Sequence, residues 1–150
     1  MIAAHPSTRD QPPTNAFSIE LTVAACDIDE QGHASNIEVV RWMSRAAGMH
    51  SVSLGYDTPA YERLGAMFVI RRHEIDYLQS AQLGDQLVCH TWPSDLKRAT
   101  AERRHLVVRP ADGAIIARGL NVWAYINTKT GRPQRIPPEV RDAFDPAKFA

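Results

Sequence analysis

Hydrophobic and polar residues alternate near the start of this chain, which is the pattern of a β-strand that buries one face. The first such segment covers residues 17–25, where the apolar residues Phe17, Ile19 and Leu21 are separated by polar ones. Four further segments also read as strands, over residues 67–77, 86–92, 100–109 and 114–127. Polar segments containing glycine or proline separate most of these strands, as expected for turns.

One stretch after the first strand has the repeat of a helix instead. Ser35 is placed to cap its N-terminus, and Glu38 to reach back to the Ser35 N–H in a capping box. The apolar residues that follow fall on two sides, which predicts a helix covered on more than one side. Gly55 is expected to end this helix. A short second helix is predicted over residues 58–64, with Pro59 in its first turn.

The order of elements is therefore one strand, one long helix and four strands joined mostly by short connections. Residues 110–113 are typical of a hairpin turn, and residues 93–98 read as a polar connection. This order indicates an α+β fold in which an antiparallel sheet buries one face against the helix. Residues 1–15 are polar and carry three prolines, so we expect a flexible arm there and a single domain over residues 16–150.

Composition narrows the classes of function. Lys+Arg and Asp+Glu both number 17, so we expect neither nucleic acid nor an acidic membrane surface as a partner. The two cysteines are isolated and the histidines are scattered, so neither a metal site nor a cofactor is expected. The N-terminus lacks the pattern of a signal peptide, and no apolar stretch approaches the ~20 residues that span a bilayer. We therefore expect a cytoplasmic protein with reduced thiols.

The most specific signal is the run DIDEQGHASN at residues 27–36, followed by Arg41-Trp42. It resembles the DxDxxGHxxN…RW signature of the 4-hydroxybenzoyl-CoA thioesterase-like family. Weaker similarities extend the resemblance over roughly residues 17–138, at residues 71–78, 83–85 and 123–138. The resemblance implies a hotdog fold, in which an antiparallel sheet of about five strands wraps around one long central helix. It also implies an acyl-CoA thioesterase that acts as a homodimer or homotetramer with its active site at the interface.

Thioester hydrolysis needs a nucleophile or base and a place for the carbonyl oxygen to become negative. The resemblance gives the first role to Asp29, either as nucleophile or as general base for water. The N-terminus of a helix offers unpaired N–H groups for the oxyanion, and the resemblance makes the Asn36 N–H the expected donor. His33 would orient substrate or water, or assist proton transfer.

Each of these residues also has a purely structural interpretation. Asp29 is well placed for an Asx turn before the helix. His33 can bond the loop backbone, and the Asn36 side chain can help to cap the helix. Of the nearby carboxylates, Asp27 is expected to order the loop, and Glu38 to cap the helix rather than to act on substrate.

The remaining candidates concern substrate binding. Lys97 and Arg98 lie between two strands, where similar proteins use basic residues to grip the CoA phosphates. The alternative is an ordinary solvated pair. Trp42 and Phe68 are candidates for the acyl pocket, although apolar residues at such positions also build the core.

Three other functions stay open. An acyl-carrier-protein thioesterase would use the same chemistry, because CoA and the carrier protein share pantetheine. A non-catalytic module would bind acyl thioesters without turnover. A hotdog dehydratase or hydratase would pair a histidine with an acidic residue at a different spacing, which this sequence does not contain.

Overall fold

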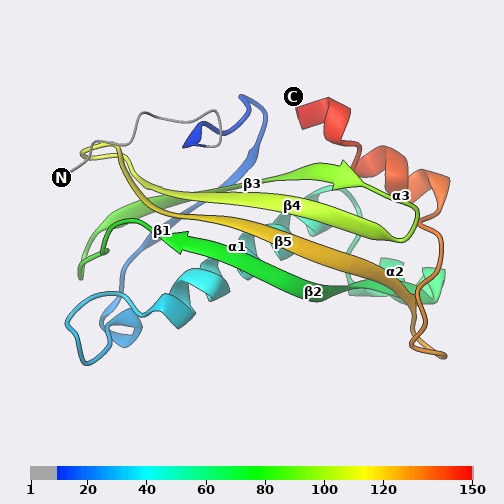
Figure 1. Cartoon of the computed structure of the whole chain (residues 1–150), viewed down its shortest axis with the longest axis horizontal. Coiled ribbons are helices and arrows are strands. Elements are labelled where there is room, and N and C mark those ends of the chain that lie inside the picture. Colours follow the sequence, from blue (N-terminus) through cyan, green and yellow to red (C-terminus); the bar gives the residue numbers. More distant parts are fainter. Residues whose placement is uncertain (1–9, 150) are drawn as a thin grey trace.

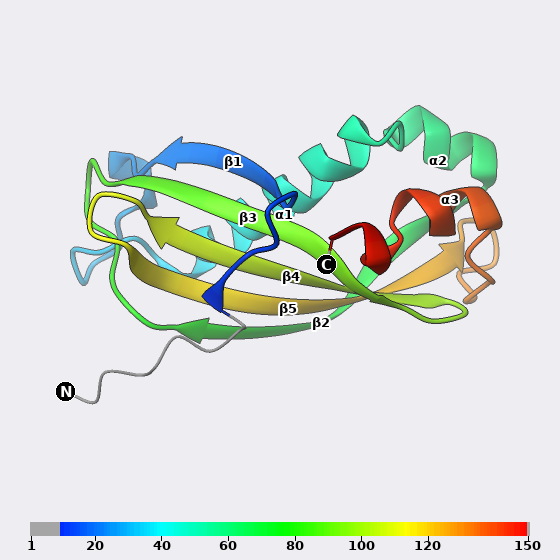
Figure 2. The same ribbon diagram turned by 90° about the horizontal axis from the view of Figure 1, so that it is seen from above.

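Five antiparallel strands form one sheet in the order β1-β3-β4-β5-β2 in the computed structural model, which describes residues 10–149. The strands are β1 (Phe17–Thr22), β2 (Ala66–Tyr77), β3 (Gln86–Leu96), β4 (Thr100–Arg109) and β5 (Ala114–Asn127). The sheet curls from β2 to β1 around the long helix α1 (Asn36–Ser53), which lies against its concave side (Figures 1 and 2). The predicted α+β architecture, a sheet wrapped around one central helix, is confirmed.

The start of α1 differs from the prediction in one respect. Ser35 caps the helix as expected, with its hydroxyl accepting from the Ile37 N–H at 3.1 Å. The predicted reciprocal bond from Glu38 is wrong, because the Ser35 N–H donates instead to the Asp27 carbonyl at 2.8 Å. Glu38 is left to pair with Arg41, one turn further along the helix, at 3.4 Å.

The shorter helices lie near the other end of α1. Helix α2 (Thr58–Leu64) has the predicted bounds, is capped by Asp57, and ends at Gly65 with φ of 66°, a left-handed conformation that suits glycine. Helix α3 (Pro138–Ala143) and the 3₁₀ turn η3 (Pro146–Phe149) close the chain beside β3 and β4 (Figure 1). None of the helices described over residues 10–149 is both long and apolar enough to cross a membrane.

Two strand ends differ from the prediction by more than one residue. β1 stops at Thr22, because the 3₁₀ turn η2 (Ala25–Asp27) follows it. β3 continues through residues 93–96, which were predicted as part of a polar connection. Beyond the β1–β3 pair Phe17–Thr91, β3 pairs with β4 alone among the described strands, and its pairing shifts between Pro93 and Asp95. Proline is tolerated in a strand at such an edge or bulge.

The helix approaches the sheet closely at one glycine. A Cβ atom at Gly119 of β5 would lie 2.9 Å from the sulfur of Met43, whose side chain is fully buried on α1. Met43 is the centre of a first apolar cluster between α1 and the strands. A second cluster lies between the sheet and helices α2 and α3, around Tyr125, Ile136 and Val140.

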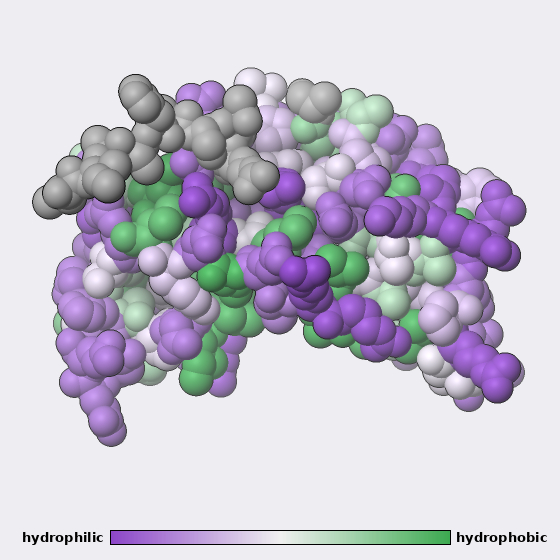
Figure 3. Space-filling view, viewed as in Figure 1, coloured by the Kyte–Doolittle hydropathy of each residue, from purple (hydrophilic) through white to green (hydrophobic). Residues whose placement is uncertain are grey.

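The opposite face of the sheet is mostly hydrophilic, with hydrophobic residues in separate patches (Figure 3). Of the predicted N-terminal arm, residues 1–9 lie outside the described part of the chain. Asp10 pairs with Arg118 of β5 at 2.7 Å.

Candidate active site

A short closed loop precedes α1 and carries two of the predicted catalytic residues. An antiparallel bridge joins Ile28 to Ala34 across its base. Inside it, the Asp29 N–H donates to the His33 carbonyl at 2.9 Å, and the Gly32 N–H donates to the Asp29 carbonyl at 3.0 Å. Gly32 has φ of 81°, so this turn favours glycine. The backbone of the loop is thereby fixed by its own hydrogen bonds.

The Asp29 carboxylate is exposed and makes one hydrogen bond. Its Oδ1 accepts from the Gln31 N–H at 2.8 Å, which is the Asx turn that the sequence also suggested. No group of residues 10–149 donates to Oδ2. The turn therefore fixes the carboxylate and leaves one oxygen open to solvent or a ligand.

The other two carboxylates near the helix are engaged in structural contacts. Oδ2 of Asp27 accepts from the Ala24 N–H at 2.8 Å, and this caps the 3₁₀ turn η2. The Asp27 carbonyl accepts from Ser35, so this residue ties the loop to the start of α1. Glu38 pairs with Arg41. Glu30 is exposed but does not line the hollow described below, whereas Asp29 does.

The first turn of α1 leaves one N–H group open as well. Ile37 donates to the Ser35 hydroxyl, and Glu38 and Val39 both donate to the Ser35 carbonyl, at 3.0 and 3.3 Å. For the Asn36 N–H, residues 10–149 provide no acceptor. An open N–H at the positive end of the helix dipole can stabilise an anionic oxygen.

These groups face one open hollow of about 450 Å³. It brings together Asp29, His33 and Asn36 with Tyr77 and the start of the β2–β3 connection. Its lining is Asp29, Gln31, His33, Ala34, Asn36, Val39, Tyr77, Leu78, Gln79, Ser80, Ala81 and Ile116.

Tyr77 is a residue of this hollow that the sequence pattern did not single out. Its hydroxyl donates to the Asn36 carbonyl at 3.1 Å, and burial raises the pKa of its phenol. Tyr77 is the last residue of β2, and alternation along that strand gives no sign of a partner 41 positions away.

The predicted phosphate-binding pair lies elsewhere in the chain. Lys97 and Arg98 are exposed in the β3–β4 turn, at the opposite end of the sheet from the Asp29 loop (Figure 1). The turn is held to the C-terminal segment, since Arg141 donates to the Lys97 carbonyl at 2.6 Å and Ile136 to the Arg98 carbonyl at 2.9 Å. A single chain therefore does not bring this pair to Asp29.

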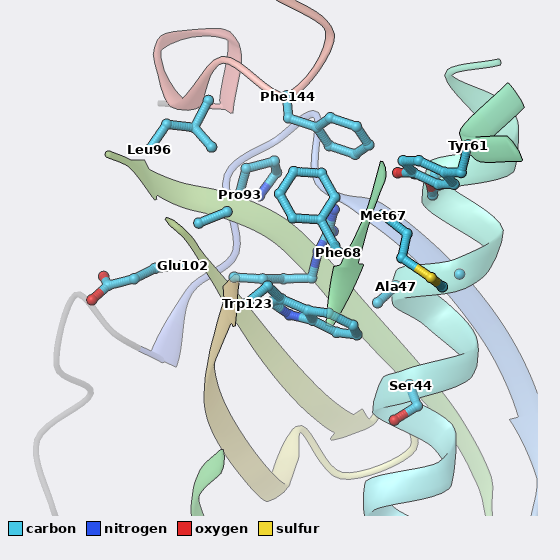
Figure 4. Close-up of a pocket in the computed structure, with 14 residues that line it drawn as sticks. Ser44, Ala47, Tyr61, Met67, Phe68, Pro93, Leu96, Glu102, Trp123 and Phe144 are labelled. Carbon is cyan, nitrogen blue, oxygen red and sulfur yellow. The ribbon is translucent and has the colours of Figure 1, made fainter. Parts of the chain in front are cut away.

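The two aromatic candidates are also separated. Phe68 lines a mainly apolar pocket of about 190 Å³ between α1, α2 and the sheet, together with Tyr61, Trp123 and Phe144 (Figure 4). Trp42 is 5% exposed in the first apolar cluster and lines a different hollow together with Arg41 and Arg45.

Comparison with known proteins identifies the family. The profile described as "Acyl-ACP thioesterase N-terminal domain" matches residues 14–144. The chain belongs to this family. Among curated proteins, an acyl-[acyl-carrier-protein] hydrolase of Cuphea viscosissima is 30% identical over 89 residues, which is 59% of this chain and 22% of the hydrolase. The matches span between 22% and 30% of the length of the curated relatives.

Solved structures show the fold of this acyl-ACP thioesterase domain. A 1,4-dihydroxy-2-naphthoyl-CoA thioesterase from Synechocystis superposes with a TM-score of 0.81 at 14% identity, over 91% of this chain and all of that one. The 12:0-ACP thioesterase from Umbellularia californica superposes with a TM-score of 0.79 at 24% identity, over 90% of this chain and 51% of that one. The resemblance to hotdog thioesterases is confirmed, and the matching profile is that of the acyl-ACP branch.

Proposed function

We propose that this domain hydrolyses acyl-CoA thioesters to the free acid and CoA. The observation that carries the proposal is one hollow with an open carboxylate oxygen of Asp29 and the open N–H of Asn36 at the start of α1. Acyl transfer needs these two elements: a group that attacks or activates water, and a donor for the developing oxyanion.

Asn36 would hold the thioester carbonyl oxygen with its N–H, so that the negative charge forms at the positive end of the helix. Asp29 would then take a proton from water as the water attacks the carbonyl carbon. In the alternative route Asp29 attacks directly, and water later cleaves the resulting anhydride. In both routes the C–S bond breaks and CoA leaves as a thiolate that takes up a proton. His33 would position the water or pass on a proton.

The substrate-binding roles depend on a second copy of the chain. We propose a homodimer or homotetramer with a composite active site, in which Lys97 and Arg98 of one chain grip the CoA phosphates beside Asp29 of another. The separation of these residues within one chain supports this proposal. The outer position of β2 and its exposed Met67 and Tyr77 support it as well. Phe68 of β2 and Trp42 of α1 would contribute to the apolar part of the site.

An acyl-carrier-protein thioesterase is the second candidate, and the family match and the names of the curated relatives favour it. Two observations favour CoA as the carrier. The chain superposes on the whole length of a CoA thioesterase, and the basic pair Lys97-Arg98 is exposed. Both carriers present the same pantetheine thioester to the hollow, so the site chemistry is shared.

We also propose a reducing, cytoplasmic setting. Cys26 is exposed and Cys89 is buried, and both are free thiols. Burial raises the pKa of the Cys89 thiol to about 12, which keeps it protonated and unreactive.

Thiol release, followed with a disulfide dye, tests the proposal. The wild-type protein is assayed with a panel of acyl-CoAs and with the same acyl groups on acyl carrier protein. We expect turnover of at least one acyl-CoA, with the carrier-protein form slower. Faster release from the carrier protein would make the second candidate correct. Binding of acyl-CoA without any thiol release would contradict a hydrolase and support a non-catalytic module.

A further inference from the structure

Arg103 of β4 is a buried cation. Its side chain lies under α1, and the residue is 7% exposed. Nη1 contacts the His50 Nδ1 at 2.9 Å and donates to the Thr91 hydroxyl at 3.1 Å. Burial, together with Arg103, lowers the pKa of His50 to about 4, so His50 is neutral at physiological pH and acts as the acceptor. Burial lowers the pKa of Arg103 to about 10, which still leaves it charged.

No carboxylate of residues 10–149 pairs with Arg103. Two other arginines of the sheet show the contrast, because Arg109 pairs with Asp85 and Asp112, and Arg118 pairs with Asp10 and Asp76. Residues 1–9 contain neither Asp nor Glu. Among the described residues this buried charge has no counter-charge, which is unfavourable and favours the binding of an anion.

Two nitrogens of the Arg103 guanidinium have no acceptor within residues 10–149, and Arg103 lines a pocket. Residues 10–149 provide acceptors for Nη1 but none for Nε or Nη2, which form the edge that binds a carboxylate with two parallel hydrogen bonds. Arg103 lines the apolar pocket of about 190 Å³ that Phe68, Trp123 and Phe144 also line. Glu102, next to it in sequence, also lines the pocket, but its carboxylate points away from these rings (Figure 4).

We propose that this pocket binds the acyl group of an ω-carboxyacyl thioester, with the terminal carboxylate paired to Arg103. The apolar walls suit the methylene groups, and the guanidinium suits the planar anion at their end. The volume is below the ~300–1,000 Å³ typical of sites for drug-sized ligands, which favours a short chain. The inference rests on the proposed thioesterase function, because it names the acyl class for that reaction.

Two acyl-CoA series of equal carbon number test the pairing, one with a terminal methyl group and one with a terminal carboxylate. Charge-assisted hydrogen bonds of this kind predict a preference of about tenfold or more in kcat/KM for the carboxylated series. Arg103→Met removes the charge at similar length, and we expect it to abolish or reverse that preference. Arg103→Lys keeps the positive charge but lacks the two parallel N–H donors of the guanidinium, so it should retain part of the preference. Wild-type preference for the methyl series, or an unchanged ratio in Arg103→Met, would overturn the inference.

Direct binding separates this inference from the proposed hydrolysis. Calorimetric titration of the wild-type protein with free short dicarboxylic acids, and with monocarboxylic acids of equal length, requires no turnover. Tighter binding of the dicarboxylic acid that Arg103→Met removes would support the pocket even if no thioester were hydrolysed. Equal binding of the two acids by the wild type would exclude it, whether or not the variant folds.

Discussion

The Tyr77 hydroxyl donates to the Asn36 carbonyl at 3.1 Å and so ties the last residue of β2 to the first residue of α1. The contact joins the outer strand of the sheet to the helix turn that carries the open Asn36 N–H. It also places a phenol next to Asp29 and His33 in the lining. The position of the helix end is therefore set partly by a strand far away in sequence.

Replacing Tyr77 with phenylalanine should lower kcat modestly. The variant removes one exposed hydrogen bond, worth about 1 kcal/mol, so the first turn of α1 is held less firmly. We expect a loss of several-fold in kcat, by at most about tenfold, with little change in Tm. Tyr56→Phe is the matched control, since Tyr56 lies outside the hollow. An unchanged kcat in Tyr77→Phe would show that this contact does not position the site.

Replacing Asp29 with asparagine should abolish most of the activity and leave the loop intact. The asparagine oxygen can still accept from the Gln31 N–H, so the Asx turn is preserved. It can neither attack the thioester nor take up a proton. We expect kcat to fall by about a hundredfold or more, which corresponds to ~3 kcal/mol in the barrier.

Glu30→Gln is the control for Asp29→Asn, because it neutralises the adjacent exposed carboxylate. Thiol release and thermal unfolding are measured on both variants. A loss in Glu30→Gln equal to that in Asp29→Asn would indicate a general effect of charge and would remove the special role of Asp29.

Replacing Asn36 with proline tests the oxyanion donor. Asn36 is the first residue of α1, where proline is well accepted, and Ser35 before it has the extended conformation that a following proline requires (φ −61°, ψ 142°). The substitution deletes the open N–H at little expected cost to the helix. We expect kcat to fall ~100–1,000-fold, as when one oxyanion donor is removed from other enzymes.

Asn36→Ala separates the backbone from the side chain, because it keeps the N–H and removes only the amide. We expect a much smaller loss than in Asn36→Pro, provided that both variants retain the Tm of the wild type. Equal losses in the two variants would assign the effect to the Asn36 side chain instead.

Stability should fall on acidification because of His50. Its pKa in the folded protein is about 4, below the usual 6.5, so the unfolded chain takes up a proton first as the pH falls. Protonation of His50 in the unfolded chain therefore lowers the free energy of unfolding as the pH falls from 6.5 to about 4. Above pH 6.5 the contribution of His50 to stability is constant. His50→Gln keeps an acceptor for Arg103 without titrating, so its Tm should decline less steeply over the same range. Burial also lowers the pKa of His105 and His90, so the decline in this variant should be shallower rather than absent.

Removing the basic pair should weaken CoA binding without affecting the chemistry. In Lys97→Ala/Arg98→Ala we expect KM for acyl-CoA to rise by about tenfold while kcat is kept, because the phosphates are bound equally before and during the reaction. The effect should shrink at high salt. Lys129→Ala, in another exposed turn, is the control. An unchanged KM for acyl-CoA would leave the pair as ordinary solvated side chains.

Oligomeric state provides a further check. Light scattering should show a dimer or tetramer at micromolar concentration, since the proposed phosphate-binding pair and Asp29 lie at opposite ends of one chain (Figure 1). A stable monomer with full activity would exclude a composite site.

The local elements, and the loop that carries the candidate catalytic residues, follow from the sequence alone. The bounds of α2, β4 and β5 agree with the predicted ranges, because alternation, capping residues and turn residues act over a few positions. Asp29, His33 and Asn36 fall in one hollow for the same reason, since they belong to one loop and the helix turn that follows it.

Which polar groups form hydrogen bonds or ion pairs, and which stay without a partner, depends on the tertiary structure. Glu38 does not bond the Ser35 N–H as predicted, because that N–H donates to the Asp27 carbonyl. The contact of Tyr77 with Asn36, and the burial of Arg103 against His50, join residues 41 and 53 positions apart. Hydrogen bonding and burial depend on which distant segments the curled sheet brings around α1, and no pattern within one segment records that.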